Sequence, residues 1–160
     1  MSSMLALLGF VIRELGLSAE DLLLDFEARL RVQKAVYLLQ ACGFGFNYDF
    51  DLYIRGPYSS ALADDYMAIA RHGDGEVAKL AEAARPDEKL LAALEELKKA
   101  DTKVLELAAT LHALLEAYKE RYTDWTVDEV LDHLKFLKPW AEEQDIRNAL
   151  SLLKVLGLFR

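Results

Sequence analysis

Apolar residues recur at helical spacing along most of the chain, and this pattern predicts a mainly α fold. The predicted helices span residues 3–15, 27–42, 60–70, 103–119, 127–137 and about 141–156. Residues 76–101 are rich in Ala, Glu, Lys and Leu, and Pro86 divides them into two short exposed helices. With a further short helix after Ser18, we expect seven or eight helices in one domain over residues 1–160, with a motif-bearing core at about 20–70 and a helical bundle at about 76–160.

Capping signals support several of these boundaries. Ser18 with Asp21, and Thr126 with Glu129, have the spacing of a capping box at a helix start. Gly16, Gly43 and Gly157 follow apolar helical segments, where glycine commonly ends a helix.

The segment 27–42 is apolar on two sides of the helical wheel, which predicts that it is the central and most buried helix. Lys34 falls within one apolar stripe, and Gln33 lies at its edge. A lysine at such a position usually lays its methylene stem along apolar surface and keeps its amine in water. The alternative is a buried amine paired with a carboxylate or with an acidic group of a partner.

Residues 48–54 alternate between apolar and polar positions, the pattern of a half-buried strand. Residues 43–47 are a turn or a partner strand in this interpretation. Gly56-Pro57-Tyr58-Ser59 then predicts an abrupt turn, and Ser59 or Ser60 is placed to cap the next helix. Three helices followed by a strand is the order of a winged helix. We therefore expect a winged-helix-like helical domain with one short strand or hairpin near residues 48–54.

Composition and charge narrow the class of protein. Hydrophobic residues make up 53% and charged residues 29% of the 160 residues, as in a globular protein with a core. The net charge of −8 disfavours nucleic acid as a partner. No apolar run approaches the ~20 residues that span a bilayer, so no membrane association is expected. The single cysteine, Cys42, lies in an apolar run, which predicts a buried, inert thiol in a cytoplasmic protein.

No residue set predicts catalysis, a metal or a cofactor. His72, His112 and His133 belong to no metal-binding motif, and no phosphate loop or nucleophile elbow is present. Asp64 and Asp65 diverge on a helix and are interpreted as early-turn carboxylates that complement the helix dipole. We expect a protein that is not an enzyme, with a small hydrolase or nuclease as the remaining catalytic alternative.

A DNA-binding transcriptional regulator is the second functional hypothesis. The helices 103–119, 127–137 and 141–156 have helix-turn-helix lengths, and a homodimer would strengthen two weak basic patches. The would-be recognition helix nevertheless begins Ala-Glu-Glu-Gln-Asp at 141–145, which places carboxylates where phosphates would lie. A role of these helices in packing is favoured.

Two segments carry a resemblance to known families. Residues 29–39 read Arg-Leu-Arg-Val-Gln-Lys-Ala-Val-Tyr-Leu-Leu, and residues 53–62 read Tyr-Ile-Arg-Gly-Pro-Tyr-Ser-Ser-Ala-Leu. They resemble the uncharacterised YwgA-like proteins of bacteria and archaea and, more distantly, the Panacea (SocA-type) antitoxin domain. Those families show a Leu-Gln-Lys-hydrophobic-Tyr helix and an aromatic strand that ends in Tyr-Gly-Pro. The resemblance covers roughly residues 20–70, and Arg55 departs from it, because the Panacea pattern often has Tyr there.

The resemblance implies a winged-helix-like fold and a non-enzymatic role in toxin neutralisation, in proteolytic adaptor work or in transcriptional regulation. Together with the absence of a catalytic constellation, it favours a protein-interaction or regulatory module that is antitoxin-like. The partner is expected to be a toxin, a protease or the transcription machinery. The predicted partner-binding residues are Gln33, Lys34, Tyr37, Tyr53, Arg55, Gly56, Pro57, Tyr58 and Ser59. Whether Tyr58 packs on the helix 27–42 or projects outward is left open.

Overall fold

The computed structural model describes residues 3–160, which form nine α-helices and one two-stranded hairpin. This confirms the predicted mainly α fold with one short hairpin, although the helices exceed the predicted seven or eight. The elements are α1 (Met4–Glu14), α2 (Ala19–Leu24), α3 (Phe26–Ala41), β1 (Asp51–Tyr53), β2 (Gly56–Tyr58), α4 (Ser60–Arg71), α5 (Asp74–Ala83), α6 (Glu88–Lys99), α7 (Thr102–Arg121), α8 (Val127–Leu137) and α9 (Glu143–Val155).

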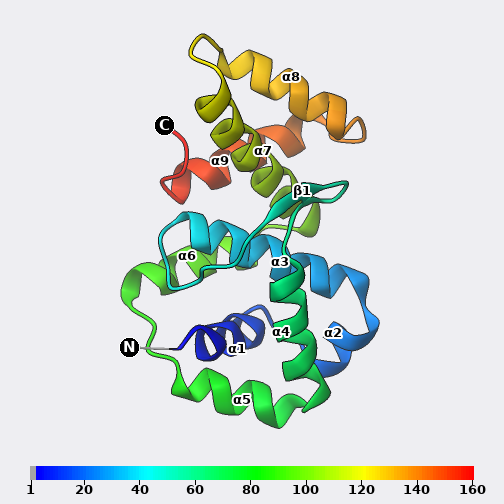
Figure 1. Ribbon diagram of the computed structural model, residues 1–160, viewed down its shortest axis with the longest axis vertical. Coiled ribbons are helices and arrows are strands. Elements are labelled where there is room, and N and C mark those ends of the chain that lie inside the picture. The colour runs from blue at the N-terminus through cyan, green and yellow to red at the C-terminus, as the bar shows by residue number, and fades with distance from the viewer. Residues whose placement is uncertain (1–2) are drawn as a thin grey trace.

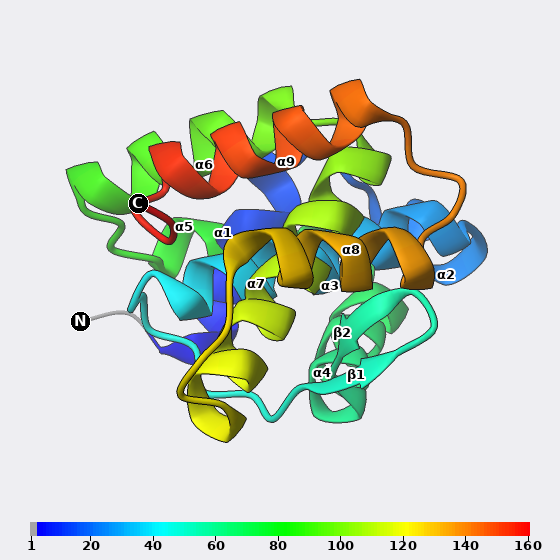
Figure 2. The same ribbon diagram turned by 90° about the horizontal axis from the view of Figure 1, so that it is seen from above.

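Figure 1 shows two groups of helices with α3 and the hairpin between them. Helices α1, α2, α4 and α5 lie below α3, and α7, α8 and α9 lie above it. Seen from above, the hairpin lies beside α4 and below α8 (Figure 2). The hairpin thus contacts α3 on one side and α7 on the other, which places its short strands at the junction of the two groups.

The prediction that the helix 27–42 is the most buried is wrong, because α1 has the larger buried fraction. Seven of the 11 residues of α1 are buried, against nine of the 16 residues of α3. The reason is the close packing of α1 on α5, where Gly9 leaves room for the neighbouring helix: a Cβ built on Gly9 would lie 2.5 Å from Leu80 Cβ. The expectation of an exposed pair of helices over 76–101 is also wrong, because α5 buries Val77 and Ala81, and α6 buries Leu90, Ala93, Leu94 and Leu97.

Most predicted helix boundaries are confirmed. Ser18 and Asp21 form the capping box of α2, and Ser59 caps α4 by accepting a hydrogen bond from Leu62 N. At α8, Thr126 accepts from Glu129 N, but Glu129 accepts from the Thr126 hydroxyl rather than from its backbone N–H, so the second capping box is incomplete. In a complete capping box the Glu129 carboxylate would accept from Thr126 N, whereas here it accepts from the Thr126 hydroxyl.

The hairpin differs from the predicted one. Gly56–Tyr58, predicted as a turn, is strand β2 and pairs with Asp51–Tyr53, with Leu52 opposite Pro57. The turn lies at Ile54 and Arg55, and the segment 43–47 provides no partner strand. Gly56 follows the turn with φ of +94°, while no non-glycine residue in 3–160 has a positive φ. Gly56 therefore supplies the left-handed backbone conformation that completes the reversal begun at Ile54 and Arg55.

Candidate functional site

A groove of about 640 Å³ opens between α3, α4 and the hairpin. The groove has three walls. On each of the two helices, the apolar residues that line it are four positions apart and so share one face. Phe26 and Leu30 come from α3, Ala63 and Met67 come from α4, and the hairpin supplies the third wall. The complete lining consists of Phe26, Arg29, Leu30, Gln33, Lys34, Tyr53, Ile54, Arg55, Gly56, Tyr58, Ala63, Tyr66 and Met67.

Gln33 holds the start of α4 against α3. Its side-chain amide donates to Ser59 O at 2.8 Å and accepts from Ser59 N at 2.9 Å, and both residues are buried. This pair satisfies two backbone groups at the point where β2 ends and α4 begins. Gln33 is therefore committed to holding the groove open rather than to contacting a ligand.

Lys34 is completely buried beneath the hairpin, so the prediction of an amine in water is wrong. Its Nζ donates to Pro57 O at 2.5 Å, which ties α3 to β2. The pKa of Lys34 is lowered to about 7, chiefly by burial; the attraction of Glu106 opposes this shift, and the positive charges of Lys138 and Arg55 add to it. Gly56 of the hairpin packs against the end of the lysine side chain, which is inaccessible to solvent.

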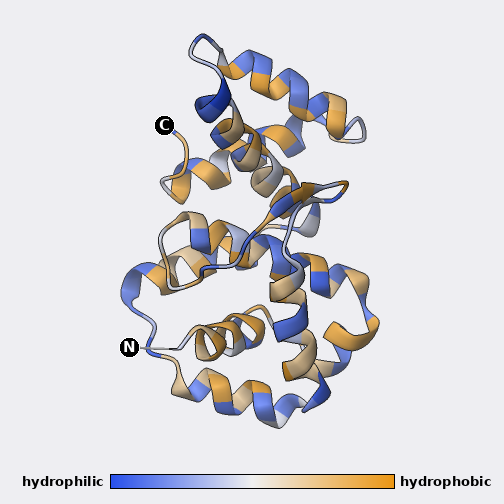
Figure 3. Ribbon diagram, viewed as in Figure 1, coloured by the Kyte–Doolittle hydropathy of each residue, from blue (hydrophilic) through white to orange (hydrophobic). Residues whose placement is uncertain are grey.

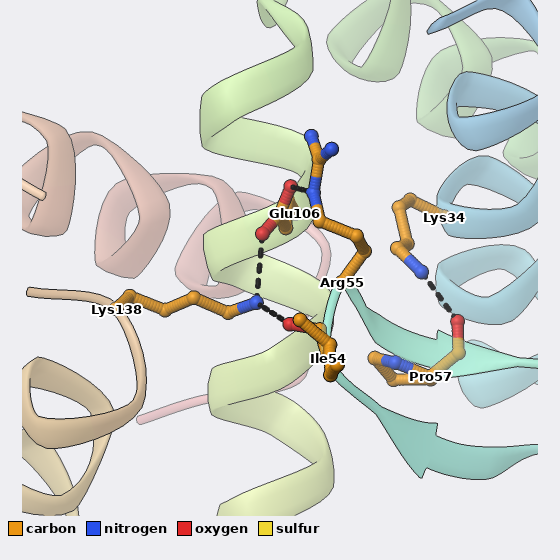
Figure 4. Close-up of polar contacts among 6 residues, drawn as sticks. All are labelled: Lys34, Ile54, Arg55, Pro57, Glu106 and Lys138. Atoms are coloured by element: carbon orange, nitrogen blue, oxygen red, sulfur yellow. Dashed lines mark hydrogen bonds and ion pairs between the residues drawn. The ribbon is translucent and has the colours of Figure 1, made fainter. Parts of the chain in front are cut away.

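Glu106 of α7 is the centre of a buried ionic network (Figure 4). Its two carboxylate oxygens accept from Arg55 Nε at 2.8 Å and from Lys138 Nζ at 2.7 Å. Lys138, just after α8, also donates to Ile54 O at 2.5 Å. Glu106 and Lys138 are both nearly inaccessible to solvent, whereas about half of the Arg55 side chain is exposed. The network thus fastens the hairpin tip to α7 and to the end of α8.

Apolar side chains are exposed around this fastened tip. Ile54 is 90% exposed and Phe26 is 52% exposed, and Tyr53 contacts Tyr58 edge-on with their ring centroids 5.7 Å apart. Phe136 and Trp140, two residues before and after Lys138, are also exposed. Figure 3 shows apolar residues both on the hairpin and along α8. We call Phe26, Tyr53, Ile54, Tyr58, Phe136 and Trp140 the hairpin surface.

The structure brings together most of the residues predicted as partner-binding. Gln33, Lys34, Tyr53, Arg55, Gly56 and Tyr58 line the groove, and Pro57 and Ser59 lie behind it, where their backbone carbonyls accept from Lys34 and Gln33. Tyr58 lines the groove, is 37% exposed and has its ring edge-on to Tyr53. Tyr37 lies elsewhere, because its hydroxyl is hydrogen-bonded to His112 Nδ1 at 2.9 Å and its ring packs edge-on against Phe50.

The structure also tests two predictions about single residues, Asp65 and Cys42. Asp65 does not lie in the first turn of α4; instead it accepts from the Tyr48 hydroxyl at 2.6 Å, so its interpretation as a helix-dipole carboxylate is wrong. Cys42 is half-buried, and burial raises the pKa of its thiol to about 11, as expected of an unreactive cysteine.

Several residues of the site were missed in the sequence. Glu106 is the one carboxylate between residues 104 and 115 of an otherwise mostly apolar helix, and Lys34 lies in an apolar stripe of another. A charged side chain in an otherwise apolar helix needs a polar or charged partner when it is buried, so these two residues indicate a buried polar cluster. Phe26 and Met67 carried no comparable signal, because their places in the groove depend on how α3 and α4 pack.

The described residues provide little for other kinds of site. Within 3–160, no group of three or more His, Cys, Asp or Glu side chains is placed to hold a metal ion. Over the same residues, no helix combines the length and the apolar character needed to cross a membrane. The groove with its ionic network is therefore the candidate binding site.

No protein-family model, curated protein or solved structure matches the chain in comparisons of sequence and fold.

Proposed function

We propose that this protein is a protein-interaction module and that the hairpin surface with its groove is the contact surface. The single observation that carries this proposal is Ile54, an isoleucine that is 90% exposed although its own carbonyl is held by Lys138. Contiguous apolar surface that remains in water is typical of interaction sites. Around Ile54 such surface is presented on both sides, by the groove and by the end of α8.

The anchoring of the hairpin supports the same role. A contact loop that is already ordered loses less conformational entropy when it binds. Here the tip is held through Arg55 and Lys138 by Glu106, and β2 is held through Pro57 by Lys34. Together with the bond from Lys138 to Ile54 O, these contacts order a hairpin with only three residues per strand, which would be marginal alone.

The resemblance described above places the proposed partner among toxins, proteases and the transcription machinery, so that an antitoxin-like or regulatory role is part of this proposal. A cytoplasmic location and formation of a homodimer are compatible with it. DNA binding has less support. The first turn of α9 carries Glu143 and Asp145, and Glu143 pairs with Lys135 at 3.1 Å, so the helix that would meet DNA begins with acidic groups.

The proposal is tested by capture of partners from the native host on immobilised protein, with the bound proteins identified by mass spectrometry. Ile54→Ser and Phe136→Ser remove exposed apolar contacts from the hairpin surface. Leu91→Ser, on α6, is the matched control, because Leu91 is also an exposed apolar residue but lies outside this surface. We expect a protein that is retained by the wild type and the control and lost with both surface variants. Identical captured proteins from all four baits would contradict the proposal.

A further inference from the structure

The rim of the groove presents two arginines on one exposed aromatic ring. The guanidinium carbons of Arg29 and Arg55 lie 5.9 and 5.4 Å from the centroid of Phe26. Arg29 donates through Nη1 to Leu22 O and Leu23 O, and Arg55 donates through Nε to Glu106. The two Nη atoms of Arg55 have no acceptor among residues 3–160, and Figure 4 shows them pointing away from Glu106. The rim therefore has unused donors of fixed orientation.

Among residues 3–160, the cations of this cluster outnumber the carboxylates that pair with them. Glu106 is the carboxylate that neutralises the cluster, yet it already pairs with both Arg55 and Lys138. Arg29 adds a further cation at the mouth of the groove. The chain as a whole has a net charge of −8, and Asp25 and Glu27 flank Phe26, but no ion pair joins either carboxylate to Arg29 or Arg55 among residues 3–160. Arginine donors without a carboxylate partner favour an anionic group in a partner.

The groove below the rim is apolar. Leu30, Ala63 and Met67 line its helical walls, while the amide of Gln33 is occupied by Ser59. Exposed apolar side chains also lie outside the groove lining, at Phe136 and Trp140 on either side of Lys138, whose Nζ donates to Ile54 O. An occupant that covers both regions is larger than a small molecule held at the rim. The occupant that matches both features is a polypeptide segment with apolar side chains and a carboxylate beside them.

We infer that the groove binds a segment of a partner protein in which an Asp or Glu lies next to apolar side chains. The carboxylate is held at the rim by Arg29 and Arg55 on Phe26, and the apolar side chains enter between Leu30 and Met67. This inference rests on the proposed function and adds the chemistry of the partner. A nucleic acid would bring phosphates to the rim but no apolar side chains for the groove.

The test uses a library of random displayed peptides selected on the full-length protein. The enriched peptides are then synthesised in pairs with the acidic residue kept or replaced by its amide, and their affinities are measured by fluorescence anisotropy. We expect enrichment of Asp or Glu beside Phe, Leu or Ile. Loss of a charge-assisted hydrogen bond predicts about tenfold weaker binding of the amide peptide. Arg29→Glu should weaken the acidic peptide by at least as much.

Arg13→Glu is the matched control, because Arg13 also stacks on a phenylalanine, Phe10 at 5.4 Å, but on α1 and outside the groove. It should leave the affinity within about twofold. Circular dichroism melts of both arginine variants show whether each is folded. Sodium octanoate, a free carboxylate with an apolar tail, serves as a competitor. Binding of octanoate as tight as that of the peptides would overturn the assignment to a polypeptide.

Three further results would overturn the inference: enrichment of peptides without acidic residues, equal affinity of acidic and amide peptides, or no effect of Arg29→Glu on a folded protein. A library that yields no peptide would also overturn it. If the captured host protein still depends on Ile54 and Phe136 in any of these cases, the proposed function stands and only the acidic chemistry of its partner is rejected.

Discussion

Gly56 packs so closely against Thr110 that a Cβ built on Gly56 would lie 2.6 Å from Thr110 Oγ1. Thr110 belongs to α7 and is buried, and its Oγ1 has no hydrogen-bond partner among residues 3–160. The hydroxyl thus lies against the hairpin as a steric neighbour. Gly56 is needed there for two separate reasons, its φ of +94° and the space that its missing side chain leaves for α7.

Gly56→Ala is therefore expected to destabilise the protein more than an ordinary glycine replacement. Strain from the positive φ costs about 1 kcal/mol, and displacement of α7 adds about 1–3 kcal/mol. Gly16→Ala is the control, because Gly16 has φ of +74° and open space around it. Urea unfolding measures both. Equal losses in the two variants would show that the contact with Thr110 carries no energy. Adding Thr110→Ala to Gly56→Ala should recover part of the loss.

Glu106→Gln is expected to be strongly destabilising. It leaves Lys138 nearly inaccessible to solvent without a full negative charge, and removing one partner of a buried ion pair costs roughly 3–5 kcal/mol. Glu95→Gln is the control, because Glu95 pairs with Lys98 at 3.1 Å on the surface and such pairs contribute about 0–1 kcal/mol. Chemical denaturation measures the difference. A Glu106→Gln variant as stable as Glu95→Gln would mean that the network does not hold the hairpin.

Local sequence patterns are sufficient to predict where most helices begin and end. The capping box at Ser18 and the cap at Ser59 depend on residues within three positions, and the helical stripes depend on residues within one or two turns. The same patterns failed at the hairpin. Whether Gly56–Tyr58 turns or pairs is decided by contacts from α3 and α7, because Lys34 holds Pro57 O and Thr110 packs against Gly56.

The sequence predicts the part of the candidate site that lies in neighbouring elements, but not the part that depends on long-range contacts. Motif residues such as Gln33, Lys34 and Tyr58 meet at the groove, since they belong to two neighbouring elements. The ionic network does not follow from any short segment, because Glu106 lies 51 residues from Arg55 and Lys138 lies 84 residues from Ile54. Tyr37 is predicted in the site as the Tyr of the Leu-Gln-Lys-hydrophobic-Tyr motif, but its hydroxyl is hydrogen-bonded to His112.

The buried amine of Lys34 predicts a particular dependence of stability on pH. The pKa of Lys34 is about 7 in the folded protein and near 10.5 when the chain is unfolded. Between these values the unfolded chain binds more protons, so this residue makes the free energy of unfolding rise with pH, by up to about 1.4 kcal/mol per unit. Below about pH 7 the full cost of burying the charged amine is present.

Lys34→Met removes this titration and keeps the apolar stem. We expect the stability of the wild type relative to Lys34→Met to increase from about pH 7 toward pH 10, measured by urea unfolding at each pH. Lys98→Met, at an exposed lysine on α6, should run parallel to the wild type. Parallel profiles for Lys34→Met as well would show that the amine keeps its proton in the folded state.

Tyr58→Ala separates interaction from stability. Tyr58 lines the groove, is 37% exposed and contacts Tyr53 edge-on, so its removal should cost about 1 kcal/mol and lower the melting temperature by roughly 2–4 °C. Tyr66→Ala is the matched control, because Tyr66 lines the same groove but is 1% exposed, and truncation of a buried aromatic costs about 3–5 kcal/mol. Thermal melts and capture of the host partner are measured together. We expect Tyr58→Ala to lose the partner while remaining folded at the temperature of the capture experiment. If Tyr58→Ala melts as early as Tyr66→Ala, the residue stabilises the hairpin and does not belong to the contact surface.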